Sequence, residues 1–188
     1  MKNFGAKIGD KLILTKPLGV GITTTAYKNK IIKDGDYDKM IKSMTTLNKY
    51  AMDILLKYRC HALTDVTGFG LLVHTSEMVR NDVSCKIYTN RIPLLNQNIK
   101  YYIENKMLTG ASPRNEDKVI ESVEYQLSKG KIWYKYLLLD PQTSGGLLCS
   151  MDSNDAEKAI KDLSKLDLES NIIGEIIEKK EKSIYVLE

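Results

Sequence analysis

The spacing of hydrophobic residues divides the chain into short strands and amphipathic helices. Residues 11–15 and 85–89 favour half-buried strands, and apolar runs at residues 147–151, 171–177 and 183–187 predict further strands. From Met40 to Tyr58, apolar residues recur three or four positions apart, which predicts one face of a long helix. Strands and helices of this kind, mixed along the chain, indicate a protein with both elements in one layered core.

The remaining segments complete this pattern. Residues 131–139 favour a strand, although their aromatic residues would also suit a helix, and residues 108–115 favour a loop. Helices are predicted over residues 22–32, 71–78 and 119–127, around residues 101–103, and after residue 154, where Asn154 and Glu157 resemble a capping box.

The last quarter of the chain has the order strand, helix, strand, strand. We interpret the charged residues 178–182, which separate the last two strands, as the solvated tip of a hairpin. This order predicts an α+β fold, a layered α/β sandwich with a mixed sheet that is partly ferredoxin-like.

Length and composition fit one domain with a sizeable core, because the chain has 188 residues of which 43% are hydrophobic. We expect residues 1–10 to be a lead-in and residues 11–188 to form one α/β domain. No apolar run is long enough to span a bilayer, so we expect no membrane partner. The net charge is +4 without a basic stripe interleaved with aromatics, so we expect no nucleic-acid partner.

The three cysteines, Cys60, Cys85 and Cys149, are scattered and form no CxxC motif. An odd number without a disulfide framework fits a reducing compartment, which predicts a cytoplasmic protein. Each cysteine lies in or beside an apolar run, so we expect three buried thiols. His61 and His74 have no zinc-type spacing to the cysteines, and we expect structural roles for both.

The stretch with the clearest chemistry is residues 62–72, with the sequence ALTDVTGFGLL. A short strand ends at Asp65, a turn with Gly68 and Gly70 follows, and then an amphipathic helix begins. Asp65 could bind a hard cation such as Mg²⁺, and the N–H groups at the helix start could bind phosphate. Alternatively, Asp65 caps the helix and the glycines allow close packing.

A related run recurs at residues 139–148, with the sequence LDPQTSGGLL. Two turns that each combine an acid with glycines favour a site for a polyanion more than either turn would alone. For Asp140 we favour the role of a turn starter. Lys16 could contact phosphate, but we favour a solvated lysine before a proline. The GxG at residues 19–21 is interpreted first as a turn, although it could line the same cleft.

Three motifs therefore follow one another: LTKPLGVG at residues 14–21, LTDVTGFGLL at residues 63–72 and DPQTSGGLL at residues 140–148. In this order and spacing they resemble the second half of selenophosphate synthetase (selenide, water dikinase), over nearly the whole chain. Arg114 and Asn115 fit a further element of that family, and Val73 departs from it where the family usually has glycine. The resemblance implies the C-terminal domain fold of the aminoimidazole ribonucleotide synthetase superfamily, which includes the hydrogenase-maturation dehydratase and thiamine-phosphate kinase.

The resemblance implies an ATP-using enzyme that makes selenophosphate from selenide and releases AMP and phosphate, with Mg²⁺ as cofactor. It implies that Asp65 is the one metal ligand in this half, whereas the catalytic cysteine or selenocysteine lies in the N-terminal half, through which the full-length protein dimerises. Residues expected near the nucleotide phosphates are Thr67, Gly68, Gly70, Thr143, Ser144, Gly145 and Gly146.

On this interpretation the chain is a C-terminal fragment that is inactive by itself, and none of its residues is catalytic. Two rival hypotheses stay open. One is another ATP-using member of the same superfamily, and the other is a non-catalytic domain that acts in trans with a separate N-terminal half.

Overall fold

A seven-stranded mixed sheet forms the centre of the computed structural model, which describes residues 2–80, 82–166 and 169–188. The strand order within these residues is β2-β5-β1-β6-β3-β7-β4. The pairs β3–β7 and β4–β7 are parallel, and the other four pairs are antiparallel. The strands are β1 (Lys11–Leu14), β2 (Cys60–Asp65), β3 (Val83–Tyr88), β4 (Val123–Gln126), β5 (Leu147–Met151), β6 (Asn171–Glu178) and β7 (Ile184–Leu187). The α+β fold with a mixed sheet is thereby confirmed.

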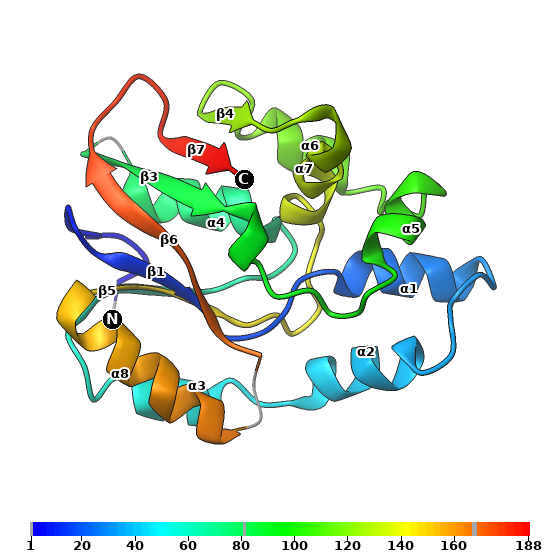
Figure 1. Ribbon diagram of the computed structural model, residues 1–188, viewed down its shortest axis with the longest axis horizontal. Helices are drawn as coiled ribbons and strands as arrows, with labels where there is room; N and C mark the ends of the chain where they lie inside the picture. The colour runs from blue at the N-terminus through cyan, green and yellow to red at the C-terminus, as the bar shows by residue number, and fades with distance from the viewer. Residues whose placement is uncertain (1, 81, 167–168) are drawn as a thin grey trace.

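Helices cover both faces of this sheet (Figure 1). The α-helices of the described residues are α1 (Val20–Lys28), α2 (Asp36–Thr45), α3 (Lys49–Leu55), α4 (Gly70–Val79), α5 (Ile99–Glu104), α6 (Ser112–Asp117), α7 (Trp133–Leu138) and α8 (Ser153–Leu163). Helices α3 and α8 lie side by side on one face, whereas α4 lies on the other (Figure 1). Among the residues that the structure describes, no helix has the length and apolarity needed to cross a membrane.

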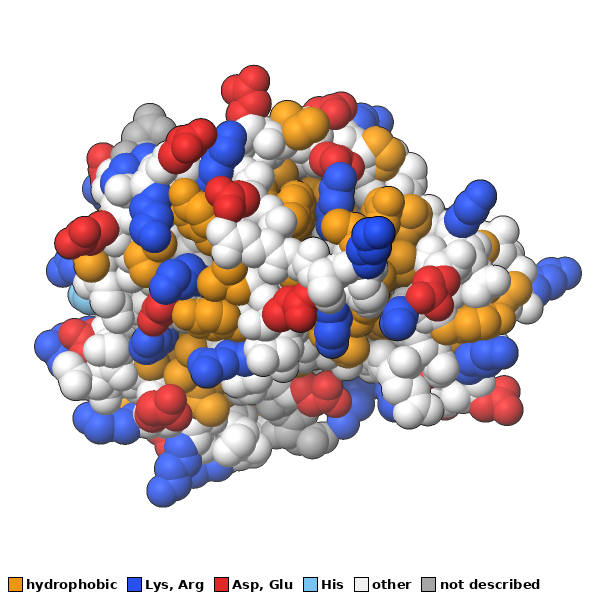
Figure 2. Space-filling view, turned by 45° about the horizontal axis from the view of Figure 1, so that its top comes forward, with side chains coloured by type: hydrophobic (Ala, Val, Ile, Leu, Met, Phe, Trp, Pro, Cys, Tyr) orange, Lys and Arg blue, Asp and Glu red, His pale blue; other side chains and the backbone are white. Residues whose placement is uncertain are grey.

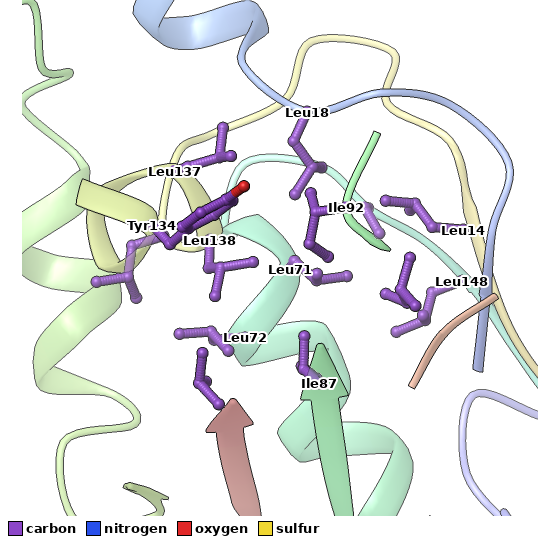
Figure 3. Close-up of a cluster of buried hydrophobic side chains, with 14 of the residues drawn as sticks. Leu14, Leu18, Leu71, Leu72, Ile87, Ile92, Tyr134, Leu137, Leu138 and Leu148 are labelled. Carbon is purple, nitrogen blue, oxygen red and sulfur yellow. The ribbon is translucent and has the colours of Figure 1, made fainter. Parts of the chain in front are cut away.

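The larger hydrophobic cluster lies on the α4 side of the sheet. Figure 3 shows Leu71 and Leu72 of α4 in the middle of this cluster, close to Leu138 of α7 and Ile87 of β3. All four side chains are fully buried. The leucines that follow the first glycine turn are therefore core residues, and their burial holds the start of α4 against the sheet.

The helix predicted from Met40 to Tyr58 is two helices, α2 and α3, because the backbone becomes extended at Thr46. The ammonium group of Lys16 accounts for this break. This group donates to the carbonyls of Ser43 and Thr46 at distances of 3.1 and 2.6 Å, at the point where α2 ends. A cation at a helix C-terminus satisfies carbonyls that the next turn would otherwise use.

Four further predictions about single elements were wrong. Residues 119–127 contain the strand β4, which is held by parallel pairing with β7, and residues 131–139 contain the helix α7. Helix α6 begins inside the segment expected to be a loop, with Pro113 in its first turn. The N-cap of α8 is Asp152, whose side chain accepts from the N–H of Asn154, so the expected capping box is absent there.

The last two strands do not form the expected hairpin, because β3 lies between β6 and β7 in the sheet. Residues 178–181 are exposed, as a solvated connection should be, but they cross the end of β3. The sequence pattern identified both strands correctly, but their pairing depends on a strand about 90 residues earlier in the chain.

Candidate functional site

The three motifs, far apart in the sequence, meet at one end of the strands β1, β2 and β5. The N–H of Val66, from the first glycine turn, donates to the carbonyl of Gly146 in the second turn at 2.8 Å. The N–H of Leu147 donates to Thr15 Oγ1 at 2.8 Å, which joins the second turn to the end of β1. Backbone contacts thus hold the two turns and the β1 end in one unit.

Glycines are required where this unit is packed most closely. A Cβ atom on Gly145 would lie 2.0 Å from the carbonyl oxygen of Val66, and one on Gly146 would lie 2.5 Å from the backbone nitrogen of Lys16. No side chain fits at such distances from backbone atoms. Gly145 and Gly146 therefore have a close-packing role, which the sequence suggested only for the glycines of the first turn.

The glycines of the first turn differ from each other. Gly70 has φ +72°, and a Cβ there would lie 2.8 Å from the carbonyl carbon of Leu139, so it also has a packing role. Gly68 is exposed and has no atom within 4 Å of the position of a Cβ. Of the two, only Gly68 presents open backbone to a ligand.

The carboxylate of Asp65 is exposed at the end of β2. It lines an open pocket together with Asn48, Met52, Leu63, Thr64 and Leu147. No described residue donates a hydrogen bond or forms an ion pair with its side-chain oxygens. A carboxylate that is accessible and without a protein partner fits a ligand of Mg²⁺, which prefers oxygen donors.

This carboxylate does not form a complete metal site with its neighbours. In the described part of the chain there is no group of three or more His, Cys, Asp or Glu side chains that could hold an ion. Mg²⁺ usually keeps several waters and binds to one or two carboxylates and to substrate phosphates. The donor set here therefore fits one contribution to a shared magnesium site, and the assignment of Asp65 as its ligand stays a prediction.

Asn48 connects the Asp65 pocket to the second glycine turn. The side-chain amide of Asn48 donates to the carbonyl of Gly145 at 2.8 Å, and Asn48 also lines the pocket. Thr143 and Ser144 of that turn are exposed, and Ser144 has φ +50°. These two exposed residues thus directly precede the glycine whose carbonyl Asn48 binds.

The first turn has fewer free donors than its sequence suggests. The N–H of Thr67 donates to Nε2 of His74 at 3.2 Å, so this amide is already satisfied within the chain. Nε2 of His74 acts as an acceptor, which confirms the expected structural role of the histidine. A phosphate could contact the Thr67 hydroxyl or the open backbone at Gly68, and these contacts stay predictions.

The prediction of a solvated lysine at position 16 was wrong. Lys16 is 2% exposed, and its ammonium donates to the carbonyls of Ser43, Thr46 and Ser144, the last at 2.8 Å. Burial lowers the pKa of Lys16. This cation fastens the second glycine turn to the end of α2, which places it among the residues that shape the site.

Replacing Lys16 with methionine should lower the free energy of unfolding by about 2 kcal/mol, because buried carbonyls lose a charged donor. Urea denaturation of the two proteins measures this difference. Lys39 lines a pocket beside Lys16 but is itself exposed, so Lys39→Met is the matched control and should change stability little. Equal stability of the two variants would contradict the anchoring role.

The side chains of the third motif bind the N-terminus of α1. Asp140 Oδ2 accepts from the N–H groups of Gly21 and Ile22 at 3.0 and 3.2 Å. Gln142 Oε1 accepts from the N–H groups of residues 19 and 20, each at 3.2 Å. The amides of the GxG turn are therefore satisfied within the protein, and the turn interpretation holds. Asp140 is a fully buried helix cap, which is more than the turn starter expected from sequence.

Burial raises the pKa of Asp140 to about 7, and this effect outweighs its hydrogen bonds from Ile22, Gln142 and Gly21. Between about pH 4 and pH 7 the unfolded chain therefore loses a proton that the folded protein keeps. Stability should fall as pH rises through this window, relative to Asp140→Asn, by at most about 1.4 kcal/mol per pH unit. Urea unfolding of both proteins across the window tests this, and a constant difference would contradict it.

Sequence reasoning missed several residues that hold the site together. Asn115 Nδ2 donates to the carbonyls of Gly68 and Leu139 at 3.1 and 3.0 Å, so one amide joins both glycine turns. Asn48, Gln142 and Lys16 act in a similar way. Asn115, Lys16 and Gln142 carried a signal, since each lies in a segment that matched the family, but that signal did not reveal which groups they bind.

Comparison with known proteins gives a consistent result. The family described as AIR synthase related protein, C-terminal domain, matches residues 7–187. The selenide, water dikinases of Campylobacter jejuni and Clostridioides difficile are 38% and 40% identical to this chain over 184 and 190 residues. These alignments cover 98% and 100% of this chain but 52% and 54% of those proteins, so the chain spans about half the length of the curated relatives it matches.

The fold also matches a solved structure, that of the hydrogenase maturation protein HypE in complex with ATP. The TM-score is 0.67 at 15% sequence identity, over 98% of this chain and 49% of that one. At this identity the likeness establishes a shared fold.

Proposed function

Because the chain belongs to the family of AIR synthase related proteins, as their C-terminal domain, we propose that it is the C-terminal half of a selenide, water dikinase. The whole enzyme makes selenophosphate from selenide and ATP and releases AMP and phosphate. The observation that carries this proposal is the sequence identity with curated selenide, water dikinases over nearly the whole chain, the three motifs included.

In this proposal Asp65 contributes one carboxylate to Mg²⁺ at the boundary with the other half of the enzyme. Its exposure, its position in an open pocket and its lack of a partner among the described residues support the role. When bound, Mg²⁺ supplies charge neutralisation for the ATP phosphates, which phosphoryl transfer requires.

In the two glycine turns, some residues serve close packing and others are exposed to a ligand. Gly70, Gly145 and Gly146 let the backbones approach closely and so fix the shape of the pocket wall. Gly68 and the exposed Thr143 and Ser144 are the positions at which a phosphate would meet open backbone or hydroxyl groups. Catalytic groups come from the other half of the enzyme, as the resemblance implied.

We further infer a cytoplasmic homodimer without nucleic-acid or membrane partners. On the face shown in Figure 2, lysine and arginine side chains are interspersed with acidic and apolar ones, so no basic stripe crosses it. Several lysines are paired, as Lys11 and Lys86 are with Glu175 at 2.9 and 3.6 Å. Such a surface offers little of the clustered positive charge that phosphate backbones bind.

A chimaeric enzyme tests the proposal. The half of the Campylobacter jejuni protein that matches this chain is replaced by residues 1–188, and AMP and selenophosphate are measured with ATP and selenide. The expected result is selenide-dependent AMP formation, with a ³¹P signal for selenophosphate. Selenide-independent conversion of ATP to ADP would instead support the rival, another ATP-using member of the superfamily.

The chain by itself should have no measurable turnover and should bind ATP weakly or not at all, because its described residues contain no group of three or more side chains that could hold a metal ion. Isothermal titration with Mg²⁺ and ATP, and an AMP assay, measure the two quantities. Restored activity on adding a separate N-terminal half would favour the other rival, a domain that acts in trans. Selenide-dependent AMP formation by the chain alone would contradict the expectation.

A further inference from the structure

Two of the three cysteines are in direct contact across neighbouring strands. Sγ of Cys60 on β2 and Sγ of Cys149 on β5 are 2.8 Å apart. A disulfide bond is about 2.05 Å long, so less than about 1 Å of movement separates the thiols from a covalent bond. Both residues are reduced in this structure.

The strand geometry produces this contact. Strands β2 and β5 are antiparallel, with Cys60 opposite Met151 and Leu63 opposite Cys149. The register shifts between Cys60 and Ala62, where the β2 strand is irregular. Such an irregularity re-aims a side chain locally, and here the Cys60 thiol reaches its diagonal neighbour.

The two thiols differ in access to solvent. Cys60 is partly exposed on β2, which is the last strand at its side of the sheet, whereas Cys149 is 0% exposed. Donation of a hydrogen bond by the Cys149 thiol lowers the pKa of Cys60. The hydrogen bond with Cys60, and after it burial, raise the pKa of Cys149. An accessible thiol with thiolate character is the one that reacts with oxidants first.

The third cysteine provides an internal contrast. Cys85 on β3 is 0% exposed, and burial raises the pKa of its thiol well above the usual range. It is a free cysteine, and the contact between Cys60 and Cys149 does not include it. Cys85 should therefore stay reduced under conditions in which the other two react.

We propose that Cys60 and Cys149 form an oxidation-sensitive thiol pair that peroxides convert reversibly into an intramolecular disulfide between β2 and β5. This modification site is independent of the function proposed above, since it is read out on the sulfur atoms themselves. It would fasten the outermost strand, which carries Asp65 at its end, covalently to its neighbour.

The chemistry needs one equivalent of a hydroperoxide. The Cys60 thiolate attacks the peroxide, an S–O bond forms, the O–O bond breaks, and hydroxide leaves, which yields a sulfenic acid. The Cys149 sulfur then attacks the Cys60 sulfur. The S–O bond breaks as the S–S bond forms, and the hydroxyl group leaves as water with the proton of Cys149. The two thiols are oxidised by two electrons, hydrogen peroxide is reduced to two waters, and dithiothreitol reverses the oxidation.

Peptide mass mapping of the whole chain tests the proposal. The protein is treated with hydrogen peroxide in small molar excess, remaining thiols are alkylated in denaturant, and the digest is compared with and without dithiothreitol. The expected product is one peptide pair linked through Cys60 and Cys149, lighter by two hydrogens, with Cys85 alkylated. The linkage should form at least about tenfold faster than any oxidation of Cys85.

Two variants separate the roles of the pair. In Cys149→Ser, Cys60 should stop at the sulfenic acid, which dimedone traps, and in Cys60→Ser, Cys149 should stay reduced because it is buried. Cys85→Ala is the matched control and should give the same linked peptide as the wild type. Circular dichroism checks that each variant is folded, and the wild-type result stands without them.

The proposal is overturned if the wild type shows no Cys60–Cys149 peptide. It is equally overturned if the main product joins Cys60 residues of two molecules, or if Cys85 reacts as fast as Cys60. Failure of the chimaeric enzyme to use selenide would leave the disulfide unaffected, so the two proposals are tested separately.

Discussion

Asp65→Asn should lower the magnesium-dependent turnover of the whole enzyme by roughly a thousand-fold, which corresponds to the several kcal/mol that a metal ion contributes to phosphoryl transfer. The fold should be unchanged, because the side chain is exposed and no described residue binds its oxygens. An amide is a weaker ligand than a carboxylate and carries no charge, so affinity for Mg²⁺ should fall.

The measurement is AMP formation in the chimaeric enzyme as a function of Mg²⁺ concentration, with circular dichroism to confirm folding. Asp53→Asn is the matched control, because Asp53 is an exposed carboxylate on the neighbouring helix α3 and does not line the Asp65 pocket. Raised Mg²⁺ should partly rescue Asp65→Asn if the lesion is in metal binding. Unchanged turnover in Asp65→Asn would refute the metal role.

Gly145→Ala should destabilise the chain by about 3 kcal/mol or more, because its Cβ would lie 2.0 Å from the carbonyl oxygen of Val66 and 2.7 Å from Cβ of Gln142. Neither neighbour is the end of a flexible side chain. The two glycine turns would have to move apart, which would break the hydrogen bond from Val66 to Gly146. Urea denaturation followed by circular dichroism measures the free energy of unfolding.

Gly68→Ala is the control for this substitution. It lies in the other glycine turn and has open space around the position of its Cβ, so stability should change by no more than about 0.5 kcal/mol. If Gly145→Ala and Gly68→Ala were equally stable, the close contact of the two turns would not be a constraint on the fold.

The sequence pattern predicted those elements whose periodicity is strong on its own. The strands β1, β2, β3, β5, β6 and β7 and the helices α1, α4 and α8 all lie where local spacing placed them. It failed for β4, whose four residues are held by pairing with β7 from the end of the chain. It also failed for α7, because a short run of apolar and aromatic residues fits either a strand or a helix.

The part of the candidate site that depends on neighbouring residues in the sequence could be predicted. A carboxylate at a strand end followed by a glycine turn is a local feature, and Asp65 is exposed as a ligand requires. The side chains that assemble the site were not predictable. The partners of Lys16, Asn48 and Asn115 are backbone carbonyls from other segments. Every residue has a backbone carbonyl, so the sequence does not indicate which one a side chain binds.

The cap of α1 has a consequence for how the chain is made. The N–H groups of Gly21 and Gly19 at the start of this helix bind Asp140 and Gln142. These partners are 119 and 123 residues further along the chain. Strand β1 likewise pairs with β5 and β6, which are synthesised long after it. Residues of β1 and α1 therefore emerge without their native neighbours, and closing loops of this length makes their folding slow. During that interval the apolar surfaces of β1 and α1 are open to chaperones and to aggregation.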